Sequence, residues 1–101
     1  MKIAITSEGN TLSSLIDSRF GRCAFFAIFD TDIQDTEFFP NPAKESSEGA
    51  GPAAVQFIAS KGVKKIVSGE FGGKIKSLLD NLQIDMLNDS GKSISEIIKQ
   101  F

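Results

Sequence analysis

The stretch CAFFAIFDTDIQDTEFFP, residues 23–40, decides the fold that this sequence predicts. Residues 23–30 form a very apolar run, and residues 36–39 form a second, shorter run that ends at Pro40. Both runs have the composition of β-strands, and the polar residues 31–35 between them are typical of a turn. We therefore expect an antiparallel hairpin in the first half of the chain.

Regular patterns continue on both sides of this hairpin. Residues 2–6, KIAIT, alternate and are rich in β-branched side chains, which indicates a strand. Downstream, apolar spacing predicts helices at 52–61, at 74–82 and from Ser93, where Glu96 completes a capping box, and strands at 63–68 and 84–87. A hairpin followed by right-handed crossovers gives a single mixed sheet with helices packed against it. We expect an α/β fold in one domain, residues 1–101.

Composition excludes several classes of function. The chain has a net charge of -2 and no Trp or Tyr, so no basic or stacking surface for nucleic acid or for an anionic membrane is expected. Its one cysteine excludes an internal disulfide and suits a reducing cytoplasm. No apolar run approaches the ~20 residues of a membrane span, and the N-terminus does not resemble a signal peptide. The sequence predicts a cytoplasmic protein.

The chain contains no histidine, which removes the usual general base and the commonest metal ligand. Ser-His-Asp and Cys-His sites, and a closed zinc site, are therefore excluded. No pair of carboxylates has the spacing of a catalytic site, and Asp30, Asp32 and Asp35 fit a solvated hairpin turn better than a calcium loop. The strand at 2–6 carries no carboxylate for a two-metal nuclease. We predict that the protein is not an enzyme.

Four irregular segments are expected to meet at one edge of the sheet. If the strands at 2–6, 63–68 and 84–87 run parallel, then the loops that follow them lie together, and ligands of α/β sheets favour that edge. The segments are 7–22, 40–51, 69–73 and 88–92, and they include Gly9, Gly21, Gly49, Gly51, Gly69, Gly72 and Gly73.

Two glycine motifs in these segments partly match known phosphate-binding loops. GAGPAA, residues 49–54, has dinucleotide-type spacing but does not directly follow a strand. A loop and helix cap that needs small residues for close packing is the better interpretation, and the free N–H groups at this helix start could still bind some anion. GEFGGK, residues 69–74, lacks the spacing and the Ser or Thr of an ATP-binding loop. This second segment either wraps a ligand or only turns tightly.

The segment just before the hairpin carries the candidate ligand-binding side chains. Arg19 and Arg22 bracket Phe20-Gly21, and guanidinium groups bind carboxylate or phosphate with two hydrogen bonds. Positive charge near Cys23 would lower its pKa and favour a metal-binding thiolate. The alternative is that an arginine pairs with Asp17 and that Cys23 is a small buried hydrophobe.

The sequence also resembles a known family. The stretches that carry the resemblance are DSRFGRCAFFAIFD (17–30), NP (41–42), GAGPAAVQFIASKGVKKIVSGEFGG (49–73), LLDNLQIDML (78–87) and SISEIIKQF (93–101). Their order and spacing resemble the NifX/NifB-type dinitrogenase iron–molybdenum cofactor biosynthesis domain. The resemblance implies a ribonuclease-H-like fold with strand order 3-2-1-4-5, and binding or carrying of an iron–sulfur-type metallocluster or its precursor.

The resemblance also implies a set of binding residues: Arg19, Phe20, Gly21, Arg22, Cys23, Gly49, Gly51, Gly69, Gly72 and Gly73, with Cys23 as the metal ligand. A tetra-iron cluster normally takes four thiolates, which one cysteine cannot supply. The cluster would need exogenous ligands, or a homodimer in which a second chain donates its own Cys23. We expect a non-enzymatic cluster carrier that works with a cluster-handling protein. The alternative is a regulatory or protein-interaction module that binds an anionic ligand or partner without metal chemistry.

Overall fold

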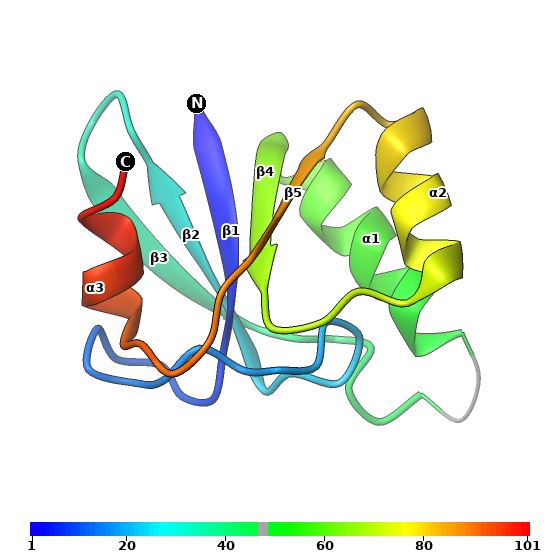
Figure 1. Ribbon diagram of the computed structural model, residues 1–101, viewed down its shortest axis with the longest axis horizontal. Coiled ribbons are helices and arrows are strands. Elements are labelled where there is room, and N and C mark those ends of the chain that lie inside the picture. The colour runs from blue at the N-terminus through cyan, green and yellow to red at the C-terminus, as the bar shows by residue number, and fades with distance from the viewer. Residues whose placement is uncertain (47–48) are drawn as a thin grey trace.

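The computed structural model describes residues 1–46 and 49–101, which form one five-stranded sheet and three helices (Figure 1). The elements are β1 (Lys2–Ser7), β2 (Phe25–Asp30), β3 (Asp35–Pro40), α1 (Ala50–Ser60), β4 (Val63–Ser68), α2 (Gly73–Asn81), β5 (Asp85–Asn88) and α3 (Ile94–Ile98). The strand order β3-β2-β1-β4-β5 confirms the expected α/β topology. β2 is antiparallel to β1 and β3, whereas β4 is parallel to β1 and β5.

The hairpin is present, but β2 begins two residues later than predicted. Its register pairs Phe25 with Pro40 and Asp30 with Asp35. The chain enters β2 at Phe25 after a turn at residues 20–22, so Cys23 lies before the strand rather than in it. Pro40 closes β3 at the sheet edge, where a missing N–H is tolerated.

Helix α1 begins two residues earlier than the predicted start at Pro52. Gly49 has a positive φ of 66° and precedes the helix, and its carbonyl accepts from the Ala53 N–H at 3.0 Å. The left-handed conformation of Gly49 lets the chain turn sharply into α1. Pro52 therefore stands inside the first turn, where its missing N–H costs nothing.

The two faces of the sheet carry separate cores, as strand alternation requires. α1 and α2 cover one face, and α3 covers the other (Figure 1). On the α1/α2 side lie Ala4, Phe26, Ile28 and Ile66, and on the α3 side lie Ile3, Ile5, Ala27 and Val67. Within the described residues, no helix has the length and apolar character needed to cross a membrane.

The expected meeting of loops at one end of the sheet is confirmed. The Gly69 N–H donates to the Asp17 carbonyl at 3.3 Å, and the Ile16 N–H donates to the Lys92 carbonyl at 2.9 Å. The segment before α1 contacts the loop at 7–22 through Asn41, whose side chain donates to the Gly21 carbonyl at 3.0 Å. Residues 47 and 48 of the predicted segment 40–51 lie outside the described residues.

Candidate functional site

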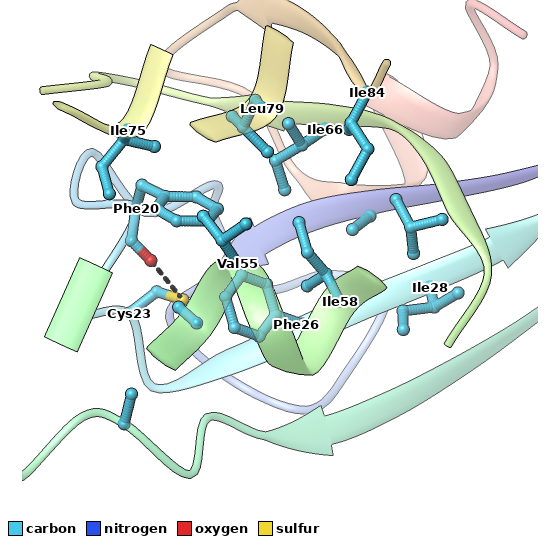
Figure 2. Packing of buried hydrophobic residues seen from close by; sticks show 14 of the residues in the cluster. Phe20, Cys23, Phe26, Ile28, Val55, Ile58, Ile66, Ile75, Leu79 and Ile84 are labelled. Carbon is cyan, nitrogen blue, oxygen red and sulfur yellow. Dashed lines mark hydrogen bonds between the residues drawn. The ribbon is translucent and has the colours of Figure 1, made fainter. Parts of the chain in front are cut away.

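The cysteine lies in the interior of the protein. Cys23 is 0% exposed, and its thiol donates to the Phe20 carbonyl at 3.4 Å. The Asn41 amide lies 3.7 Å from the sulfur. Figure 2 shows the sulfur pointing into the α1/α2 core, near Phe26 and Val55, with the bond to Phe20 dashed. The sulfur is therefore shielded from any ligand at the surface.

Burial reverses the expected chemistry of this thiol. Desolvation, followed by the negative charge of Asp17, raises the pKa of Cys23 to about 12. The prediction of a lowered pKa and an accessible thiolate is wrong, because neither nearby guanidinium offsets the cost of burying the charge. Cys23 behaves as the small buried hydrophobe of the alternative interpretation. Its assignment as a metal ligand remains a prediction, and it would require the turn at 20–23 to open.

The raised pKa predicts a loss of stability in alkali. Unfolding lets the thiol ionise above its ordinary pKa of 9.0, whereas the folded protein keeps it neutral up to about pH 12. The contribution of the neutral thiol to the free energy of unfolding is thus fully present below pH 9 and is lost as the pH rises toward 12. At pH 10.5 the loss amounts to about 2 kcal/mol. Urea unfolding at pH 7.5 and 10.5 should show this extra loss in the wild type and not in Cys23→Ala. An equal loss in both proteins would contradict the assignment.

The side chain of Arg19 forms its hydrogen bonds within its own loop. Its Nε and Nη2 donate to the Asp17 carboxylate at 3.2 and 3.1 Å, and its backbone N–H donates to the same carboxylate at 2.9 Å. Asp17 is buried, and its hydrogen bonds and charge raise the pKa of Arg19. The backbone of Arg19 also pairs with Glu70. The pairing with Asp17 confirms the alternative interpretation for this arginine.

Arg22, by contrast, lies on an open pocket. Its Nη1 donates to the Lys44 carbonyl at 2.9 Å and to the Ser46 carbonyl, and no carboxylate of the described residues pairs with it. The pocket has a volume of about 450 Å³. Its lining consists of Gly21, Arg22, Gly49, Ala50, Gly51, Pro52, Lys74 and Ile75. Arg22 from the turn and Lys74 from α2 supply the positive charge of this site.

Close backbone packing shapes the floor of the pocket. A Cβ on Gly21 would lie 3.0 Å from the Cα and N of Gly51, and a Cβ on Gly51 would lie 2.4 Å from the Cδ1 of Ile75. The turn at 20–23 therefore rests directly against the start of α1. Among the residues that the structure describes, no side chain caps α1, and its first turn carries no acidic residue. Uncapped amides at a helix start, with two cations beside them, favour an anion.

The pocket unites four of the predicted binding residues: Gly21, Arg22, Gly49 and Gly51. Phe20 instead packs in the core, with its ring 5.9 Å from those of Phe26 and Phe71. Among the remaining predicted glycines, Gly69 packs against Ser18, and Gly72 and Gly73 start α2. The prediction missed Lys74 and Ile75. Lys74 stood directly after the glycine pair of GEFGGK, which was the available signal.

The same architecture occurs in proteins of similar sequence. Residues 1–101 match the family described as dinitrogenase iron-molybdenum cofactor. An uncharacterized protein of Methanocaldococcus jannaschii is 35% identical over 104 residues, which cover 100% of this chain and 85% of that protein.

Two solved structures are also similar. The apo form of the orange protein from Desulfovibrio gigas superposes with a TM-score of 0.93 at 32% identity, over 99% of this chain and 85% of that one. A putative NifB protein from Thermotoga superposes with a TM-score of 0.85 at 31% identity, with the same coverage of both chains. The resemblance noted in the sequence is confirmed: this chain belongs to the dinitrogenase iron-molybdenum cofactor family.

Proposed function

We propose that the protein is a non-enzymatic carrier for an anionic metallocluster, an iron–sulfur or iron–molybdenum precursor, held at the pocket of Arg22 and Lys74. The observation that carries the proposal is the joint exposure of two cations and an uncapped helix start on one concave surface. Within the described part of the chain, the hydrogen bonds of the Arg22 guanidinium go to neutral carbonyls, and an anion would form stronger, charge-assisted bonds with it.

The donor groups of the pocket favour a cluster that arrives with its own ligands. The chain has no histidine, and its one thiol is buried. Among the described residues, no group of three His, Cys, Asp or Glu is arranged to hold a metal ion. Electrostatic holding without a covalent protein ligand suits a carrier, because the cargo can leave intact for a cluster-handling partner. Such binding should also weaken as the salt concentration rises.

An interaction module is the second candidate. The guanidinium of Arg22, which forms no ion pair with any carboxylate of residues 1–46 and 49–101, could bind the carboxylate of a partner protein instead of a cluster. Partner binding would then respond to Arg22 substitutions in the absence of any metal, which separates the two functions.

The test is an anaerobic titration with tetrathiomolybdate, a molybdenum–sulfur dianion whose visible absorbance reports retention by the protein in dialysis. Lys74→Glu should weaken retention by roughly 10- to 100-fold, because it replaces attraction by repulsion at the pocket. Lys76→Glu is the matched control, since Lys76 is exposed on the same helix and does not line the pocket. Failure of the wild type to retain the dianion, or equal losses in both variants, would overturn the proposal.

A further inference from the structure

A buried asparagine joins the two segments that surround Arg22. Asn41 is 7% exposed, and its Nδ2 donates to the carbonyls of Gly21 and Cys23, each at 3.0 Å. Its Oδ1 accepts from the Ala43 N–H at 2.9 Å. Both ends of this side-chain amide are therefore used, one on the turn at 20–23 and the other on the loop after β3.

The backbone of Asn41 extends the same junction. Its N–H donates to the Ala24 carbonyl at 3.0 Å, and its carbonyl accepts from the Lys44 N–H at 3.3 Å. The Ser46 N–H in turn donates to the Ala43 carbonyl at 3.1 Å. Asn41 thereby orders the loop that presents the carbonyls of Lys44 and Ser46.

Asn41 bonds to the segments that hold both the backbone and the guanidinium of Arg22. The Asn41 amide donates to the carbonyls of Gly21 and Cys23, the residues on either side of Arg22. The Arg22 guanidinium donates to the carbonyls of Lys44 and Ser46, which belong to the loop that Asn41 orders. Within residues 1–46 and 49–101, Nε and Nη2 have no hydrogen-bond partner, so that edge of the guanidinium is left for a ligand.

We propose that Asn41 is a positioning residue that holds Arg22 on the pocket, with Nη1 fixed to the loop and the Nε–Nη2 edge free to take an anion with two hydrogen bonds. The proposal rests on the anion-carrier function for its purpose, whereas its geometry stands independently. An asparagine is required because one side chain must donate twice to the turn and accept once from the loop. Aspartate has the same shape but cannot donate in its ionised form.

Arginine NMR tests the geometry without any ligand. The chain has two arginines, so selective ¹⁵N labelling gives one signal set for Arg22 and one for Arg19. In the wild type, the two bonds to Nη1 should slow rotation of the Arg22 guanidinium and separate its Nη signals. In Asn41→Asp and in Asn41→Ala these signals should merge, while those of Arg19, held by Asp17, stay unchanged. Unchanged Arg22 signals in a folded variant, or loss of order at both arginines, would overturn the proposal.

A double-mutant cycle with tetrathiomolybdate tests whether Asn41 supports anion binding through Arg22. Asn41→Asp and Arg22→Lys should each weaken retention by about 10-fold, and the double variant should lose no more than Arg22→Lys alone. Asn88→Ala is the control, since Asn88 also donates to a loop carbonyl, that of Gly69 at 3.1 Å, away from Arg22. It should bind as the wild type does. Losses that multiply would show that Asn41 acts independently of Arg22. Absence of any binding alongside the expected NMR result would instead reject the carrier function and leave the geometry standing.

Discussion

Cys23 in the folded protein should react with iodoacetamide at least about 1,000-fold more slowly than in urea-unfolded protein. The side chain is 0% exposed, and burial raises its pKa to about 12, so the folded state offers neither access nor thiolate. Reaction must wait for an opening event, which for a residue in the core approaches global unfolding and its cost of about 5–15 kcal/mol. Mass spectrometry of timed samples at pH 8 measures both rates in the same protein.

The same experiment decides whether Cys23 can serve as a cluster ligand. A folded-state rate within about 10-fold of the unfolded rate would mean that the turn at 20–23 opens readily, and thiol ligation would then be accessible at low cost. Denaturant well below the unfolding midpoint is the control for local opening. If the rate rises there without a change in secondary structure, the turn opens by itself. The structure predicts that the rate instead follows global unfolding, because the sulfur packs beneath Phe20 and against Phe26.

The fold could be predicted from the sequence because its patterns agree at each level. Alternation in KIAIT places Ile3 and Ile5 on one face and Ala4 on the other, and the structure covers both faces. The capping box of Ser93 and Glu96 is also present. Boundaries were predicted less well. β2 starts late, and α1 starts early because Gly49 takes a left-handed conformation that no periodicity reveals.

The site was predicted in part, and one turn explains the rest. The side chains around the turn that begins at Phe20 differ in their burial. Phe20 and Cys23 are buried, whereas the guanidinium of Arg19 is exposed and Arg22 lines the pocket. The sequence placed arginines and thiol together, but it could not show that the turn points them to opposite sides. The pairing of Arg19 with Asp17 likewise depends on the buried position of that carboxylate.

Gly69→Ala should destabilise the protein by about 3 kcal/mol. A Cβ at this position would lie 2.5 Å from the Cα of Ser18, a backbone atom that cannot turn aside as a side chain can. The segments at 17–19 and 69–70 must then separate, which breaks the bond from the Gly69 N–H to the Asp17 carbonyl. Overpacking typically costs about 1–3 kcal/mol, and the lost hydrogen bond adds about 1 kcal/mol. Thermal unfolding should show a midpoint lowered by roughly 10–20 °C.

Gly73→Ala is the matched control for this substitution. Gly73 begins α2, and no atom of the described residues lies within 4 Å of a Cβ built there. Because alanine favours a helix over glycine, the midpoint of this variant should stay the same or rise. A Gly69→Ala midpoint equal to that of Gly73→Ala would mean that the loop junction yields without cost. The two segments would then not be held rigidly at Ser18. Because Gly69 does not line the pocket, folded Gly69→Ala protein should still retain tetrathiomolybdate well below its midpoint. That result would separate the glycine that holds the loops together from the residues that hold the anion.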